Sequence, residues 1–278
     1  MLVSIDDLAA DLSNPDLVVV DCRFNLQQPA AGSRLYAERH IPGAYYADLD
    51  RDLAGPRTAE TGRHPLPDVE DLQQLLSGFG IGPETRVVVY DEGGGALAAR
   101  LWWLLRWLGH TEVSLLDGGF AAWCAAGLPI STEVPARRKG RFVARPGSMP
   151  VATTRNIEAA LGPARSLLLD LRSHDRYLGR VEPIDPVAGH VPGAVSAPFS
   201  RNLGPDGRFL PAAELRRNYS AMIGDRPVAE VVCMCGSGVT ACHGIFALEL
   251  AGWPGAGLYV GSWSEWIRSA GRPVERES

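Results

Sequence analysis

Short apolar runs alternate with longer stretches of helical periodicity along the chain. Aliphatic runs such as residues 17–20 and 87–89 are typical of strands that are buried on both faces. Segments such as 96–108 and 239–251 repeat their apolar positions at helical spacing, and capping residues such as Ser4 precede others of this kind. The alternation predicts an α/β fold, in which βα units surround a parallel sheet covered by helices on both sides.

The same succession of motifs occurs twice. An apolar run followed by Asp, and then by Arg two positions later, ends at Arg23 and again at Arg172. The motif His-(Ile or Val)-Pro-Gly-Ala begins at His40 and again at His190. The order and spacing of the motifs are nearly the same in both halves, which indicates a duplication. We therefore expect two related α/β domains.

The stretch between the repeats sets the predicted domain borders. Residues 128–150 contain four prolines and the basic group Arg137-Arg138-Lys139. This composition favours a solvated linker, although the basic group could instead bind an acidic partner. We predict a first domain at 1–127, a linker at 128–150 and a second domain at 151–278.

Composition and charge narrow the class of protein. With 46% hydrophobic and 21% charged residues, the chain falls in the ordinary globular class. Its formal charge of −5 gives no reason to expect nucleic acid as a partner. The acidic start at Asp6 and Asp7 does not resemble a secretory leader, and no uncharged apolar stretch reaches the roughly 20 residues that cross a bilayer. We expect a cytoplasmic protein with no membrane partner.

Cys235 stands in the segment with the most unusual chemistry. It follows the apolar run 231–234, and Gly236 and Gly238 come next, before a helical segment begins. Parallel sheets bind ligands beyond the carboxyl ends of their strands, and alternate glycines allow consecutive amides to converge on one point. These amides and the positive end of the helix favour a thiolate, the nucleophilic form of cysteine. The alternative is that Cys235 is a small buried hydrophobe.

The other cysteines are expected to pack rather than react. The chain has five cysteines, an odd number that does not suit a secreted disulfide framework. Cys233 precedes Cys235 on the same strand and Cys242 follows in the helix; a redox disulfide among the three stays an alternative. The first repeat has Asp91 where the second has Cys235, so we expect it to serve as a scaffold. There is no Cys-x2-Cys pair and the six histidines are scattered, so neither a metal nor another cofactor is expected.

The segment 235–241, Cys-Gly-Ser-Gly-Val-Thr-Ala, closely resembles the active-site loop of 3-mercaptopyruvate sulfurtransferases, within the rhodanese family of tandem-domain sulfurtransferases. The resemblance covers nearly the whole chain. It implies two tandem rhodanese-like domains, each with a mostly parallel five-stranded sheet flanked by helices. It also implies that Cys235 carries sulfur as a persulfide. The substrate site implied by the loop includes Gly236, Ser237, Gly238, Val239 and Thr240.

The resemblance also bears on the sulfur donor. Thiosulfate-using relatives carry cations in the loop, whereas this loop is uncharged; 3-mercaptopyruvate is therefore the expected donor, with thiosulfate as the alternative. Relatives that use mercaptopyruvate usually carry two arginines for its carboxylate and keto oxygen. Arg176 matches the first, but the second position is Asp185, and Arg180 is a candidate for the missing group. His40 matches a position proposed to assist proton transfer.

The resemblance implies a thiol, cyanide or a thioredoxin-like protein as the sulfur acceptor. A non-catalytic module that relays sulfur would use the same loop and stays an alternative. Phosphatases that share this fold are not favoured, because their Cys-x5-Arg loop needs an arginine where this chain has Ala241.

Overall fold

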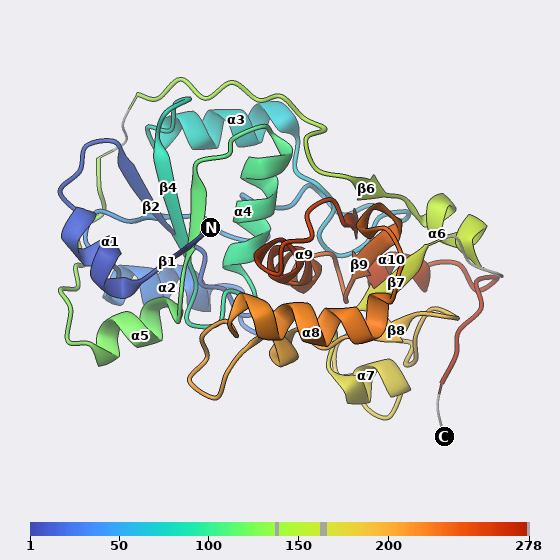
Figure 1. Ribbon diagram of the computed structural model, residues 1–278. Helices are drawn as coiled ribbons and strands as arrows, with labels where there is room; N and C mark the ends of the chain where they lie inside the picture. The colour runs from blue at the N-terminus through green and yellow to red at the C-terminus, as the bar shows by residue number, and fades with distance from the viewer. Residues whose placement is uncertain (137–138, 162–165, 277–278) are drawn as a thin grey trace. The chain divides into compact units, whose positions relative to one another are not determined.

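The chain forms two compact units in the computed structural model, which describes residues 1–136, 139–161 and 166–276 (Figure 1). The units are made of the following segments: Met1–Gly55, Leu66–Ser148 and Pro205–Phe209 in the first, and Pro56–Pro65, Met149–Gly204 and Leu210–Ser278 in the second. The segment 56–65 therefore belongs to the second unit, although it lies in the first half of the sequence. The predicted domain borders stay predictions, and Arg137 and Arg138 of the expected linker lie outside the described residues.

The first unit is built on a parallel sheet with the strand order β1-β5-β4-β2-β3. Its strands are β1 (Leu2–Val3), β2 (Leu17–Asp21), β3 (Tyr45–Tyr46), β4 (Arg86–Tyr90) and β5 (Val113–Leu116). Its helices are α1 (Ile5–Asp11), α2 (Ala31–Glu38), α3 (Val69–Gly78), α4 (Ala98–Trp107) and α5 (Gly119–Ala125). The first helix begins where the sequence predicts, because the Ser4 hydroxyl accepts a hydrogen bond from the Asp7 amide.

The second unit repeats this plan with the order β6-β10-β9-β7-β8, again parallel. Its strands are β6 (Val151–Ala152), β7 (Leu167–Asp170), β8 (Val195–Ser196), β9 (Val231–Met234) and β10 (Gly257–Tyr259). Its helices are α6 (Thr154–Ala160), α7 (His174–Leu178), α8 (Ala212–Ile223), α9 (Thr240–Leu250) and α10 (Ser262–Trp266), with short 3-10 turns η1 (Phe199–Asn202) and η2 (Val228–Glu230). The same strand order in both units confirms the predicted fold class.

The strands are buried on both faces, as their unbroken apolar runs predict. Every residue of β2 is buried, and so is every residue of β7 and β9. Helix α9 is buried along most of its length, from Ala241 to Leu248, which explains why its sequence has no polar face. Among the described residues, no helix combines the length and the apolar character that crossing a membrane requires.

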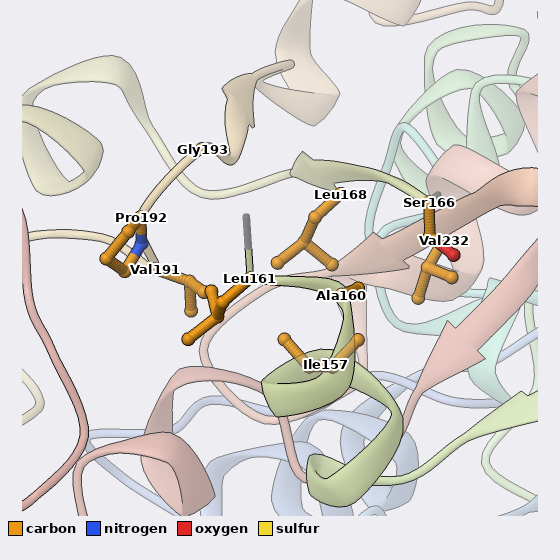
Figure 2. A pocket seen from close by; sticks show the side chains of 9 residues that line it. All are labelled: Ile157, Ala160, Leu161, Ser166, Leu168, Val191, Pro192, Gly193 and Val232. Carbon is orange, nitrogen blue, oxygen red and sulfur yellow. The ribbon is translucent and has the colours of Figure 1, made fainter. Parts of the chain in front are cut away.

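One face of the second sheet carries an apolar pocket (Figure 2). Its lining comes from α6, the strands β7 and β9, and the segment around the second His-Val-Pro-Gly-Ala motif. The lining residues are Ile157, Ala160, Leu161, Ser166, Leu168, Val191, Pro192, Gly193 and Val232. Leu168 and Val232 also belong to the core cluster on this face, so the pocket continues the hydrophobic core.

The central strand of each sheet leads into the loop that holds the candidate chemistry. Strand β4 ends before Asp91, and strand β9 ends before Cys235. The Asp91 carbonyl accepts a hydrogen bond from the Phe120 amide at 2.9 Å, and the Cys235 carbonyl accepts one from the Trp263 amide at 3.0 Å. Asp91 and Cys235 therefore occupy equivalent positions at the carboxyl edges of their sheets, where parallel α/β folds bind ligands.

Candidate active site

The backbone of Cys235 is fixed by a residue with an unusual conformation. Ser262 has a positive φ of 52°, which is rare for a residue other than glycine. Its hydroxyl accepts a hydrogen bond from the Cys235 amide at 3.0 Å and donates one to the Tyr259 carbonyl at 2.8 Å. The amide of Cys235 is therefore used by Ser262 and does not point to an anion at the sulfur.

The residues after Cys235 leave amides without acceptors. Among the described residues, none accepts a hydrogen bond from the amides of Gly236, Ser237 or Val239. Gly238 has a φ of +75°, and a Cβ there would lie 2.4 Å from the Val260 carbonyl oxygen, so the loop needs glycine at this position. Cys235 itself is only 2% exposed. The loop thus combines a buried sulfur with amides free to stabilise negative charge.

The equivalent loop of the first unit already holds an anionic group. The carboxylate of Asp91 accepts four amide hydrogen bonds. Their donors are Gly93 at 3.0 Å, Gly95 at 3.1 Å, Leu97 at 2.7 Å and Ala98 at 3.1 Å. Burial raises the pKa of Asp91, while these amides act in the opposite direction. The loop after the central strand of this fold can therefore gather several amides on one acidic side chain, as we expect for Cys235.

Gly238→Ala is expected to disrupt the Cys235 loop. The added Cβ meets the Val260 carbonyl and also imposes an unfavourable φ, so the free energy of unfolding should fall by about 2–4 kcal/mol. Gly193→Ala is the matched control, because Gly193 has the same φ of +75° but no atom within 4 Å of the added Cβ. Urea unfolding of both variants measures the difference. Equal losses in the two variants would contradict the close packing of the loop.

His64 and Ser237 form a polar pair at the loop. The Nδ1 atom of His64 lies 2.7 Å from the Ser237 hydroxyl, and both side chains are buried. His64 belongs to the segment 56–65 and is 173 positions away from Ser237 in the sequence. The pair offers a route for a proton at a site where the loop itself is uncharged.

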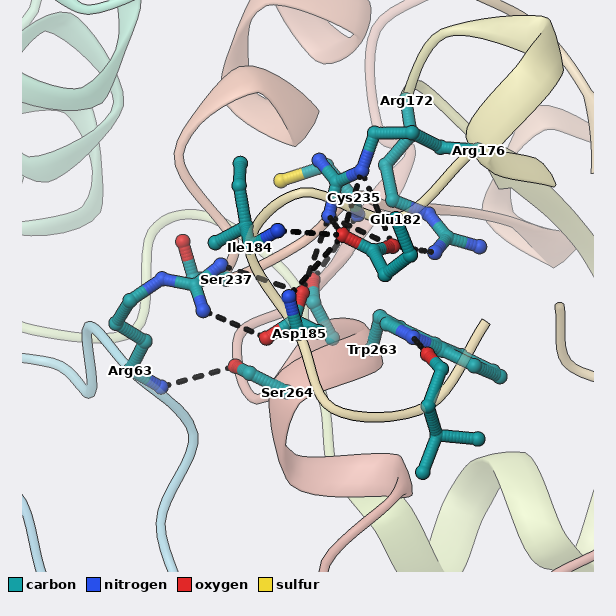
Figure 3. A network of polar contacts seen from close by, with 12 residues as sticks. Arg63, Arg172, Arg176, Glu182, Ile184, Asp185, Cys235, Ser237, Trp263 and Ser264 are labelled. Carbon is teal, nitrogen blue, oxygen red and sulfur yellow. Dashed lines mark hydrogen bonds and ion pairs between the residues drawn. The ribbon is translucent and has the colours of Figure 1, made fainter. Parts of the chain in front are cut away.

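Two arginines stand beside the loop and share one carboxylate (Figure 3). Arg63 Nη1 donates to Asp185 Oδ1 at 2.6 Å, and Arg176 Nη2 donates to Asp185 Oδ2 at 3.0 Å. A Cβ at Gly236 would lie 3.1 Å from Arg63 Nη2 and 3.5 Å from Arg176 Nη2. The residue next to Cys235 is therefore in contact range of two guanidinium groups.

A third arginine, Arg172, is linked to Arg176 through a shared carboxylate, that of Glu182. Glu182 accepts hydrogen bonds from the Nε and Nη2 atoms of Arg176 and forms an ion pair with Arg172 at 3.4 Å. Arg172 also pairs with Asp170 at 2.6 Å, and its guanidinium stacks over the Trp263 ring at 4.7 Å. Burial works against the charge of Arg172, but nearby acidic groups, including the Cys235 sulfur, outweigh it and raise the pKa of Arg172. The sulfur thus lies within the electrostatic reach of a permanent cation.

The structure brings together only part of the residue set that the sequence suggests. Arg176 and the loop 235–240 lie in one cluster, whereas the Arg180 side chain is exposed. His40, in the first unit, has Nδ1 2.7 Å from the Tyr36 carbonyl and Nε2 3.1 Å from the Glu133 carbonyl. Both of its ring nitrogens are therefore engaged by the backbone. The substrate-binding roles of Arg180 and His40 stay predictions.

Sequence reasoning did not identify Arg63 and His64. The signal available was the pair of basic residues between Gly62 and Pro65, in a stretch without apolar periodicity. A charged pair in a loop usually indicates only a solvated surface. Here the hydrogen bonds of Arg63 to Asp185 and of His64 to Ser237 hold both residues beside the loop.

The other two cysteines of the second unit are both buried. Burial raises the pKa of the Cys233 thiol, which keeps it protonated near neutral pH. The Cys242 thiol donates to the Gly238 carbonyl at 3.3 Å, which ties helix α9 to the loop. Neither thiol forms a disulfide among the residues that the structure describes.

The fold and the site together define a tandem α/β protein with one candidate cysteine nucleophile. The sequence pattern of the family described as Rhodanese-like domain matches residues 4–126 and 153–269, and the chain belongs to this family. It is 54% identical to the "Probable 3-mercaptopyruvate sulfurtransferase" of Pseudomonas aeruginosa over 275 residues, 98% of this chain and 97% of that protein. It is also 35% identical to the thiosulfate sulfurtransferase of Rattus norvegicus, over 92% of this chain and 86% of that protein.

A solved structure shows the same fold. The 3-mercaptopyruvate sulfurtransferase from Leishmania major superposes with a TM-score of 0.82 at 31% identity, over 96% of this chain and 74% of that one. The tandem rhodanese fold inferred from the sequence is thereby confirmed.

Proposed function

We propose that this protein is a sulfurtransferase that moves a sulfur atom from 3-mercaptopyruvate to a thiol or cyanide acceptor, carrying it as the sulfane sulfur of a persulfide on Cys235. The observation that carries the proposal is the uncharged loop at Cys235, with free amides and with two arginines in contact range of Gly236. The 54% identical relative, named for 3-mercaptopyruvate, supports the same donor.

In the first half-reaction, the Cys235 thiolate attacks the sulfur of 3-mercaptopyruvate. An S–S bond forms, the C–S bond of the donor breaks, and the electron pair of that bond remains on the leaving enolate. The methylene carbon of the enolate then takes a proton and becomes the methyl group of pyruvate. The pair of His64 and Ser237 is placed to move this proton, and the loop amides stabilise the persulfide anion.

In the second half-reaction, the acceptor attacks the outer sulfur of the persulfide. The S–S bond breaks and its electron pair returns to Cys235, which restores the thiolate. Cyanide or a small thiol can act in this way, and so can a thioredoxin-like protein with a reactive thiol. We place this chemistry in the cytoplasm, where thiol acceptors are kept reduced.

Thiosulfate is the second candidate donor, because the Rattus norvegicus relative named for thiosulfate is 35% identical to this chain. It would react at its outer sulfur and leave as sulfite, forming the same persulfide. A relay module that receives persulfide sulfur from another protein would also use Cys235 but would not turn over either small donor.

Steady-state kinetics with cyanide as the acceptor test the proposal. We expect turnover of both donors with a higher kcat/KM for 3-mercaptopyruvate, and parallel lines in double-reciprocal plots, because the persulfide separates the two half-reactions. A strong preference for thiosulfate would overturn the choice of donor. No turnover of either donor, together with sulfur uptake from a protein persulfide, would indicate the relay module.

A further inference from the structure

The Asp185 carboxylate binds the two arginines that lie beside the Cys235 loop. One of its oxygens accepts from Arg63 at 2.6 Å and the other from Arg176 at 3.0 Å. The Asp185 side chain is only 3% exposed, so water does little to weaken these interactions. A carboxylate of the protein itself therefore lies where an anionic sulfur donor would meet the two guanidinium groups.

The two arginines nevertheless keep unused hydrogen-bond donors. Arg63 Nε is buried, and it has no partner within the described part of the chain. Arg176 donates hydrogen bonds from Nε and Nη2 to Glu182. Its Nη1 atom is not used in these bonds and lies 3.6 Å from the position that a Cβ at Gly236 would take. If Asp185 left Arg176 Nη2, then Nη1 and Nη2 would form a free edge that matches a planar carboxylate.

The cluster as a whole carries no net charge. Three guanidinium groups and three carboxylates make it up: Arg63, Arg172, Arg176, Asp170, Glu182 and Asp185. Asp170 pairs with Arg172, and Glu182 pairs with both Arg172 and Arg176. Asp185 bridges Arg63 and Arg176, the two arginines in contact range of Gly236. The three carboxylates thus balance the charges of the three arginines, and Asp185 is the carboxylate that bridges the two arginines beside Gly236.

We propose that Asp185 is a specificity-determining residue that selects a donor with one negative charge, such as an α-keto acid thiol, over a dianion such as thiosulfate. The inference rests on the proposed function and deepens it. A donor carboxylate exchanges with the Asp185 carboxylate on the Arg176 edge at little electrostatic cost. A dianion brings a second negative charge next to Asp185 and is repelled twice as strongly as a monoanion.

Asp185→Asn tests this role, because it removes the charge and keeps the shape of the side chain. We expect kcat/KM to rise about fivefold for 3-mercaptopyruvate and about 25-fold for thiosulfate, since the repulsion scales with the charge of the donor. The ratio of the two values should therefore shift about fivefold toward thiosulfate. Asp175→Asn is the matched control, because Asp175 is exposed and its removal changes the net charge equally.

Binding of unreactive anions gives a second readout that does not depend on sulfur transfer. Pyruvate serves as the monoanion and sulfate as the dianion, titrated into the persulfide-free protein by calorimetry. The Kd of sulfate should fall several times more than the Kd of pyruvate in Asp185→Asn, and neither should change in Asp175→Asn.

An unchanged ratio of the two Kd values in Asp185→Asn overturns the role of Asp185, and so does an equal shift in Asp175→Asn. Sulfur uptake by the unmodified protein decides the proposed function separately. If the unmodified protein takes sulfur from neither donor, the proposed function fails, while the Kd ratio still decides whether Asp185 discriminates between anions by charge.

Discussion

Cys235→Ser is expected to reduce the turnover of 3-mercaptopyruvate by at least about 1,000-fold, because a hydroxyl at this position cannot carry the transferred sulfur. The serine side chain fits the same space, and the amide of residue 235 can still donate to Ser262. The loss should therefore appear in kcat without a loss of folded protein, which circular dichroism and the assay with cyanide measure together.

Cys233→Ala is the control for this experiment. Cys233 lies two positions earlier on β9, is fully buried, and has its pKa raised by burial. Its replacement should leave kcat within about threefold of the original value, since it removes a packing group rather than a nucleophile. Full activity in Cys235→Ser, or a complete loss in Cys233→Ala with the fold intact, would move the nucleophile away from Cys235.

Arg176→Gln is expected to lower kcat/KM for 3-mercaptopyruvate by about 100-fold. A hydrogen bond to a charged group contributes roughly 1.5–3 kcal/mol, and each 1.4 kcal/mol corresponds to a tenfold change in rate. The loss should fall mainly on KM, because the role we propose for Arg176 is to bind the carboxylate of the donor rather than the reacting sulfur. Initial rates over a range of donor concentrations separate the two parameters.

Two further variants show whether charge or geometry matters at this position. Arg176→Lys keeps the charge but lacks the planar edge that binds a carboxylate with two hydrogen bonds, so most of the loss should persist. Arg217→Gln removes a positive charge from the exposed face of α8 and should change kcat/KM less than twofold. A comparable loss in Arg217→Gln would show that only the net charge of the protein matters.

The fold was predictable because its signals are local and occur twice. The buried strands appear as continuous apolar runs, and the cap at Ser4 marks a helix start that the structure confirms. The repeated motifs add an independent check, because each half predicts the other. The equivalence of Asp91 and Cys235 follows from the same repeat, and the hydrogen bonds of the two loops agree with it.

The chemistry around the loop was only partly predictable, because its members are distant in the sequence. Arg63 meets Asp185 across 122 positions, and His64 meets Ser237 across 173. No periodicity or spacing links such pairs. Asp185 was recognised as a departure from the expected arginine, but its link to a second arginine in the segment 56–65 requires the folded chain.

The position of Arg180, the candidate for the missing arginine, could not be derived from the sequence around it. Arg180 lies four positions after Arg176, a separation that brings side chains together on a continuous helix. Helix α7 ends at Leu178, and Gly179 follows with a φ of 77°, so the chain turns away before Arg180. The guanidinium group that joins Arg176 in contact range of Gly236 is that of Arg63, and the role of Arg180 stays a prediction.

Mass spectrometry of the protein after incubation with 3-mercaptopyruvate tests the central claim most directly. One sulfur atom, about 32 Da, should be added to the intact chain and map to the peptide that contains Cys235, and cyanide should remove it. Labelling that maps to Cys233 or Cys242, or a mass that stays unchanged while pyruvate is released, would contradict a persulfide on Cys235.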